Sequence, residues 1–92
     1  MNDVTVRIYY RDASGYTEDA QLDMSLDDFG GVMPAIGDTI LNPGVAAGLD
    51  RSQPENREVW KVVERVFNPR DNKDYVTLVV EYRPGTSTDP WL

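Results

Sequence analysis

The stretch from Val59 to Arg83 reads VWKVVERVFN, then PRDNK, then DYVTLVVEYR, and it decides the fold class. Two runs rich in β-branched and aromatic residues flank a connector of turn-forming residues, which predicts a β-hairpin. Alternate residues of the second run are apolar, so one face of that strand is expected to be buried. The sequence therefore predicts a small, all-β, largely antiparallel domain.

The first strand of this hairpin does not alternate cleanly. Apolar residues fall on both parities between Val59 and Phe67. A β-bulge near Val62 and Val63 would reconcile the pattern, and so would strong coiling with both faces partly covered. Both devices are common where a sheet closes into a barrel. The side chains that we expect to face the core are Val76, Leu78, Val80 and Tyr82, together with Val4, Val6 and Ile8.

The residues before the hairpin predict three further strands. Asp3 to Asp12 alternates clearly, and Tyr16 to Asp23 alternates weakly, so a second strand is expected to pair with the first. Thr39 to Leu41 follows a Gly-Asp turn signal and reads as a short strand. The stretch from Val45 to Glu58 has no periodicity and predicts a long loop.

Between the second and third strands we expect at most one short helical turn. Ser25 is a suitable N-cap residue, and Asp27 and Asp28 would occupy the first turn. Gly30 and Gly31 would end the turn at once. The whole pattern predicts about five strands in one domain over residues 1–84, followed by a tail over residues 85–92.

The chain has neither cysteine nor histidine, which limits its chemistry. Disulfides, thiolate metal sites and cysteine nucleophiles are excluded, as are histidine bases and histidine zinc ligands. We therefore expect no enzymatic activity and no cofactor. The absence of disulfides and of any apolar run of roughly 20 residues favours a cytoplasmic protein without a membrane span. No basic and apolar leader is recognisable either.

The charge is unevenly distributed along the chain. Residues 1–50 contain nine acidic and two basic residues, whereas residues 51–92 contain seven of each, so the whole net charge of −7 lies in the first half. Such an acidic surface repels phosphate backbones, so we expect no direct binding of nucleic acid. It would attract a basic protein partner.

Three segments together resemble a known group of proteins. They are Pro34 to Ile40, reading PAIGDTI, then Val59 to Phe67, and then Val76 to Val80. The chain resembles the small SH3-like β-barrel proteins of bacteria and their phages over about half its length. This resemblance implies a barrel closed by a curled hairpin and a structural or accessory role. It implies no catalytic residues, since many such proteins are uncharacterised.

The acidic cluster is the first candidate site. Three interpretations are open: a solvated face that keeps the domain soluble, a docking surface for a basic partner, or a divalent metal site without the EF-hand spacing. The cluster consists of Glu18, Asp19, Asp23, Asp27 and Asp28.

Exposed aromatic residues form the second candidate site. Tyr9 and Tyr75 are expected on the outer faces of the first and last strands, where protein contact is favoured over nucleic-acid stacking by the acidic charge. Trp91 lies in the polar tail, where it could pack back on the domain, anchor a partner or remain free.

These features predict a non-enzymatic protein-binding or structural module, which could bind a basic protein or another copy of itself. The resemblance implies that the module is phage-related. The alternative is an acidic inhibitor that imitates DNA and occupies the basic groove of a nucleic-acid enzyme. Such a mimic would need its carboxylates in a row on one face, and salt would abolish its binding.

Overall fold

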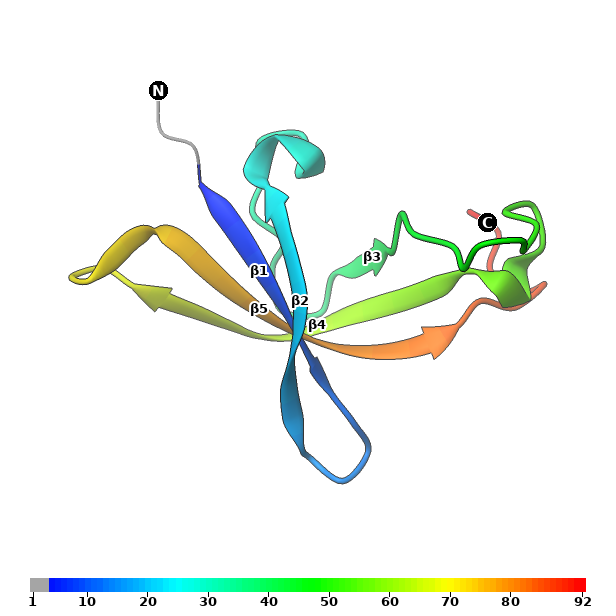
Figure 1. The fold of residues 1–92 in the computed structure, drawn as a ribbon, viewed down its shortest axis with the longest axis horizontal. Helices are drawn as coiled ribbons and strands as arrows, with labels where there is room; N and C mark the ends of the chain where they lie inside the picture. The colour runs from blue at the N-terminus through cyan, green and yellow to red at the C-terminus, as the bar shows by residue number, and fades with distance from the viewer. Residues whose placement is uncertain (1–3) are drawn as a thin grey trace.

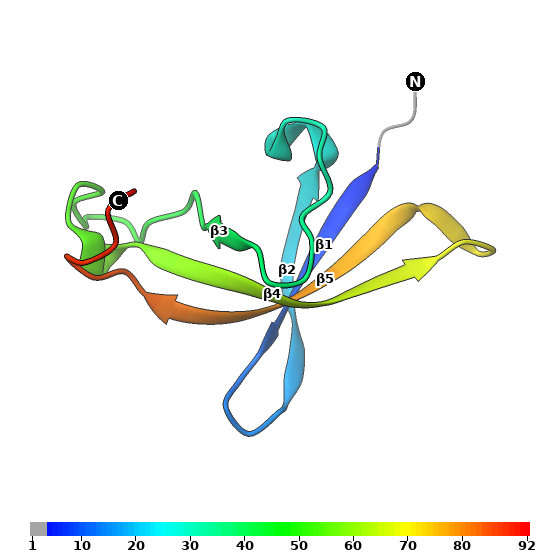
Figure 2. The same cartoon turned by 180° about the vertical axis from the view of Figure 1, so that it is seen from behind.

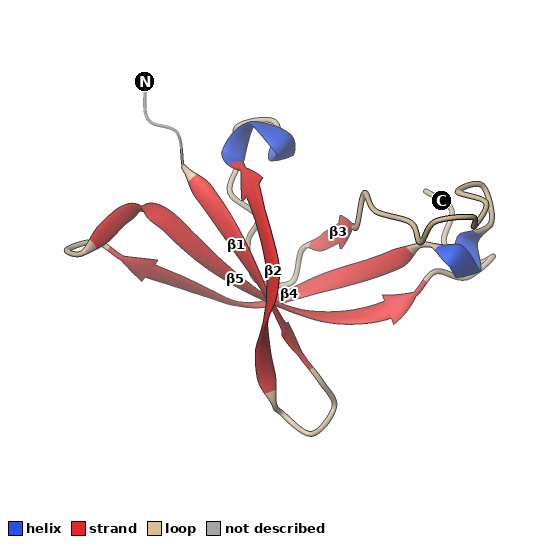
Figure 3. Ribbon diagram, viewed as in Figure 1, coloured by secondary structure: helices blue, strands red, loops and turns tan. Residues whose placement is uncertain are grey.

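The computed structural model describes residues 4–92 as one five-stranded sheet with two single-turn 3-10 helices (Figures 1 and 3). Asp3, the expected first residue of the first strand, lies outside the described residues. The strands are β1 (Thr5–Arg11), β2 (Thr17–Ser25), β3 (Thr39–Leu41), β4 (Glu58–Asn68) and β5 (Asn72–Pro84), and the helical turns are η1 (Leu26–Phe29) and η2 (Pro54–Asn56). All five predicted strands are therefore present, and the described residues contain no α-helix.

The strand order is β2-β1-β5-β4-β3, and the sheet is mixed. β1 pairs with β2, and β4 pairs with both β3 and β5, in antiparallel fashion, but β1 and β5 run parallel. The expectation of an antiparallel sheet is wrong at this central ladder. The alternation of a strand sets its buried face but not the direction of its neighbour, so the sequence pattern did not reveal the parallel pair.

The sheet is open, and the predicted barrel or strongly curled sheet is not formed. β2 and β3 end the sheet on opposite sides and do not pair with each other. The strands fan out around one crossing point when the sheet is seen edge-on, as expected of accumulated strand twist (Figure 1). The radius of gyration is 14.0 Å, above the value of about 12 Å typical of a compact domain of this length. Twist without closure therefore gives an extended molecule.

One face of the sheet, the inner face, carries the core. Val6 and Ile8 of β1 lie opposite Val76 and Leu78 of β5 in register. The remaining buried members of the core are Ile40, Trp60, Val62 and Val80, with Leu22, Met24, Phe29 and Met33 packed around them. Phe29 and Met33 belong to η1 and the segment that follows it, and this segment covers the inner face (Figure 2).

The predicted β-bulge in β4 is confirmed. The pairing of β4 with β5 shifts by one residue between Val62 and Glu64. A second shift, which the sequence did not predict, separates Ile8 from Tyr9 in the β1–β2 pair, and Gln21 there has a positive φ of 56°. Extra residues increase local twist, so both bulges favour the open fan.

Six of the seven predicted core residues are buried or half-buried, but Tyr82 is 50% exposed. Its ring packs against that of Tyr10, with centroids 4.9 Å apart, at the rim of the core. Val79, which was expected on the wetter face, is instead buried. Tyr82 lies beyond Val80, the last β5 residue that pairs with β1, so the core ends before it.

The helical turn at η1 is confirmed in detail. The Ser25 hydroxyl accepts from the Asp27 amide, and the Asp28 carboxylate accepts from the Ser25 amide, which completes a capping box. Gly30 ends the turn at φ 68°. The second turn, η2, exceeds the single turn that the sequence predicts, because Pro54 supplies the fixed φ that starts a turn.

The tail over residues 85–92 folds back on the sheet end and is not a loose extension. The Arg83 guanidinium donates to both carboxylate oxygens of Asp89, at 2.9 and 3.0 Å. A Cβ atom at Gly85 would clash with the Pro54 carbonyl oxygen, so only glycine fits against η2. Pairing with Arg83 lowers the pKa of Asp89 to about 2. The tail is thus held by charge and close packing.

Candidate interaction surface

The second face of the sheet, the outer face, is formed by the alternate side chains that point away from the core. The packing elements η1 and residues 30–38 lie on the inner face, and no described segment covers the outer face (Figure 2). The residues of the outer face are Thr5, Arg7, Tyr9, Arg11, Thr17, Asp19, Asp23, Glu64, Val66, Tyr75, Thr77 and Val79. This surface unites four of the eight predicted site residues: Tyr9, Asp19, Asp23 and Tyr75.

Arg7 lies at the centre of a hydrogen-bonded network on this face. Its guanidinium donates to both oxygens of Asp19, at 2.8 and 2.9 Å, and to Asp23 at 3.0 Å. The Tyr75 hydroxyl donates to the same oxygen of Asp23, at 2.8 Å. The bidentate geometry fixes the arginine across two strands. Two of the five predicted acids therefore share one arginine, and the network keeps a net charge of −1.

These contacts shift the pKa values of the network. Hydrogen bonds from Arg7 lower the pKa of Asp19, and hydrogen bonds from Tyr75 and then Arg7 lower the pKa of Asp23. The carboxylate of Asp23 raises the pKa of the Tyr75 hydroxyl. The charged form of each carboxylate is thus the one that the fold stabilises.

We expect Arg7→Met to destabilise the protein in a pH-dependent manner. Since the folded-state pKa of Asp19 and Asp23 is below the ordinary 3.8, their stabilisation is fully present above that pH and is lost as the pH falls through the lowered values. The difference in unfolding free energy between the parent and the variant should therefore shrink in acid. Urea titrations from neutral pH to about pH 2 measure it.

Arg70→Met is the matched control, since the Arg70 side chain is almost fully exposed and lies 3.9 Å from its acidic neighbour. Its effect should be small at every pH. An Arg7→Met effect that does not depend on pH would contradict the role of the two carboxylates.

A second ion pair joins the two hairpins. Arg11 of β1 donates to Glu64 of β4 at 2.8 Å and to the Thr17 hydroxyl at 3.0 Å. Glu64 lies opposite Val79 in register, and Tyr9 lies opposite Val79 on the other side. Val79 is thus buried between two register neighbours with long side chains, and the stems of such side chains can cover an apolar residue.

The other three predicted acids do not lie on this face. Glu18 is exposed and opposite Tyr10, while Asp27 and Asp28 lie in η1, beyond the end of β2. Asp28 is used in the capping box. The acidic segment is therefore divided between elements and does not form one continuous acidic row.

Trp91 lies in the folded-back tail, away from the outer face, and is 48% exposed. The aromatic residues of the two candidate sites are thus not brought together. Tyr9 and Tyr75 share the outer face, and Trp91 stays at the opposite end of β5.

Sequence reasoning missed a polar cluster at the rim of the core. One oxygen of Glu58 accepts from the Trp60 indole at 2.6 Å, from the Tyr10 hydroxyl at 3.2 Å and from the Asn42 amide at 3.2 Å. Burial first, and then Glu58, raises the pKa of Tyr10 to about 12. Glu58 and Trp60 are two residues apart, but Tyr10 and Asn42 are distant from them in sequence, so no local pattern predicts the cluster. The cluster ties β1, β4 and the segment after β3 together.

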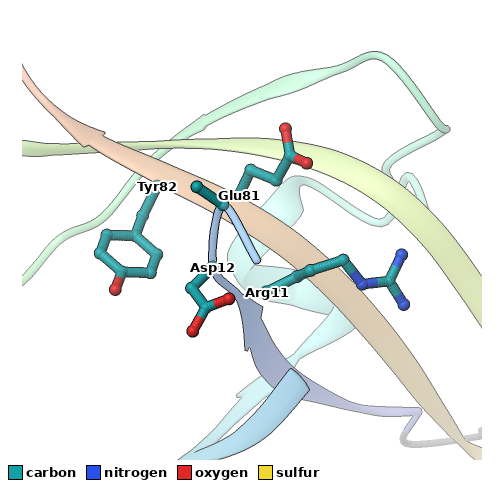
Figure 4. A pocket seen from close by; sticks show the side chains of 5 residues that line it. Arg11, Asp12, Glu81 and Tyr82 are labelled. Atoms are coloured by element: carbon teal, nitrogen blue, oxygen red, sulfur yellow. The ribbon is translucent and has the colours of Figure 1, made fainter. Parts of the chain in front are cut away.

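The hollows of the surface are shallow and open. One lies where β1 leaves β5 and is lined by Arg11, Asp12, Ala13, Glu81 and Tyr82 (Figure 4). The carboxylates of Asp12 and Glu81 point away from each other there (Figure 4). Among residues 4–92, no group of three potential metal ligands is found. No helix within the described range is long and apolar enough to cross a membrane.

Comparison of the chain with protein-family models, curated proteins and solved structures finds no match. The resemblance to SH3-like proteins of bacteria and phages therefore stays a prediction.

Proposed function

We propose that the protein is a non-enzymatic protein-binding module that docks its partner on the outer face of the sheet. The observation that supports this proposal is a sheet face with ordered side chains and no covering segment. A single-layer sheet buries one face against its own chain, and a second face left bare is available to another protein. The module would serve as a structural or accessory component.

The chemistry of the outer face suits a protein partner. Tyr9, Tyr75 and Arg7 belong to residue types that are enriched at protein interfaces. The charges of Asp19 and Asp23 are already paired with Arg7. A partner that covers them would not leave isolated buried charges, which lowers the cost of association.

The alternative, a mimic of nucleic acid, finds less support on this surface. A mimic needs uncompensated carboxylates in a row. Here Arg7 lies between Asp19 and Asp23, while Asp27 and Asp28 lie on a different element. The partner is thus expected to recognise a mixed aromatic and charged face, and its binding should tolerate salt.

Photo-crosslinking tests the proposal. Thr77 lies between Arg7 and Val66 on the outer face, and a benzophenone amino acid placed there should crosslink to a protein in an extract of the source cells. The same group at the exposed Ser87 in the tail is the control and should give no such product. Products are identified by mass spectrometry after capture at low and high salt.

Crosslinking at Thr77 that persists in high salt would support the module. Capture that occurs equally at Ser87, or that disappears in high salt, would contradict docking on the outer face and favour a charge-driven mimic.

A further inference from the structure

The outward edge of β4 is only partly paired. β3 pairs with Val59 to Lys61, and the loop before β3 bonds Val62 through Gly37 and Asp38, at 2.8 and 3.0 Å. Beyond Val62 no described strand pairs with β4 on this side. We call residues 63–68 the free edge.

The free edge belongs to an exposed arm, residues 64–74, at the turn end of the β4–β5 hairpin. Every residue from Glu64 to Asp74 is exposed, including Phe67 at 54% and Val66 at 45% (Figure 1). Residues 64–67 pair with Val76 to Val79 of β5, which β1 pairs on its other side, whereas β1 does not reach residues 72–74 of β5. A further strand added along the free edge would cover Val66 and Phe67 and would turn this edge strand into a central one.

The other outward edges are less suitable for strand addition. β2 is interrupted by its bulge at Gln21 and carries Asp19 and Asp23. The part of β5 beyond its pairing with β1 ends in Pro84, which has no amide hydrogen to donate. Bulges, charges and proline are features that prevent edge pairing. On β4 the register shifts lie at the two ends of the free edge, between Val62 and Glu64 and between Phe67 and Asn68, and residues 64–67 between them pair regularly with β5.

The sequence of the free edge is complementary to itself. In an antiparallel pair of two copies with a two-fold axis at Val66, each Val66 meets its counterpart, and Arg65 lies opposite Phe67 of the second copy. Within one chain the Arg65 guanidinium already lies 5.6 Å from the centre of the Phe67 ring. The same cation–π contact would form twice between copies. No like charges face each other in this register.

Charge also favours a second copy at this place. The whole chain carries −7 and two copies repel each other. The arm from Glu64 to Asp74 carries three acidic and three basic residues and is neutral. Two copies can therefore approach along their arms without the repulsion that the first half of the chain would cause.

We propose that two copies of this chain associate through antiparallel pairing of their free edges, with the two-fold axis at Val66. The product is one continuous sheet in which the arms of the two copies are central strands. Val66 also belongs to the outer face, but the test uses purified protein without another partner, so its result is independent of the docking of another protein on that face.

Sedimentation analysis of purified protein tests the pairing. The parent should sediment at twice the chain mass of 10.4 kDa. Val66→Asp and Val66→Lys should each be monomeric, with association weakened at least about ten-fold, because like charges meet at the axis. Mixed in equal amounts, the two variants should form a heterodimer, because opposite charges then meet. The control is Val32→Asp, because Val32 is 69% exposed and lies outside the free edge. This variant should remain dimeric.

Far-UV circular dichroism confirms that each variant is folded. A parent protein that remains monomeric at about 1 mM would overturn the proposal. So would a dimeric Val66→Asp variant, or a mixture of the two charged variants that stays monomeric, since each would place the axis elsewhere.

Discussion

Replacing Trp60 with alanine is expected to destabilise the protein by about 3 to 5 kcal/mol, as for other buried tryptophans. Trp60 is fully buried, and its ring packs edge-on against Tyr10 with centroids 6.1 Å apart. The substitution leaves a large cavity and removes the indole that donates to Glu58 at 2.6 Å. A domain with a total stability of about 5 to 15 kcal/mol would be close to unfolding.

Urea denaturation followed by far-UV circular dichroism measures this loss, since the substitution also removes a fluorophore. Trp91→Ala is the control, because Trp91 is half-exposed in the tail. Its expected effect is about 0.5 kcal/mol or less. Equal losses for the two variants would show that Trp60 is not the centre of the core.

Leu78→Ala is expected to cost about 2 to 5 kcal/mol. Leu78 is fully buried and lies opposite Ile8 across the parallel β1–β5 ladder. Truncation removes packing in the part of the core that the two hairpins share, and rigid neighbouring strands cannot collapse into the space. The unfolding free energy is measured in urea as for Trp60.

Val32→Ala provides the comparison, since Val32 is the most exposed large apolar residue described and should change stability by about 0.5 kcal/mol or less. A loss below about 1 kcal/mol at Leu78 would contradict the β1–β5 register.

The local structure could be predicted because its signals are local. Alternation placed Val76, Leu78 and Val80 in the core, and imperfect alternation placed the bulge at Val62. The cap at Ser25 followed from residue types with a known hydrogen-bonding geometry. Each of these features depends on neighbours within a few positions.

The arrangement of the strands could not be predicted in the same way. A period of two does not state whether a strand's partner is parallel, nor whether the last strand meets the first. β1 and β5 meet in parallel, and β2 and β3 stay apart. The sheet is therefore open and fan-shaped, and the predicted barrel is not formed.

The candidate site was predicted in part. Alternation placed Tyr9 and Tyr75 on the outer face, which the structure confirms. The pairing of Arg7 with Asp19 and Asp23 depends on the unpredicted bulge at Ile8 and Tyr9, which sets the register of the β1–β2 pair. Counting acids along the chain thus overestimated the free negative charge.

The parallel ladder between β1 and β5 has a consequence for how the chain folds during its synthesis. Thr5 and Tyr75 are partners in this ladder, although most of the described chain lies between them in sequence. Such non-local contacts are slow to form, because the entropy of closing a long loop must be lost first. The β1–β2 hairpin leaves the ribosome long before its neighbour β5 exists, and until then the edge of β1 is open to wrong partners. The core, which depends on this ladder, can be completed only when β5 has emerged.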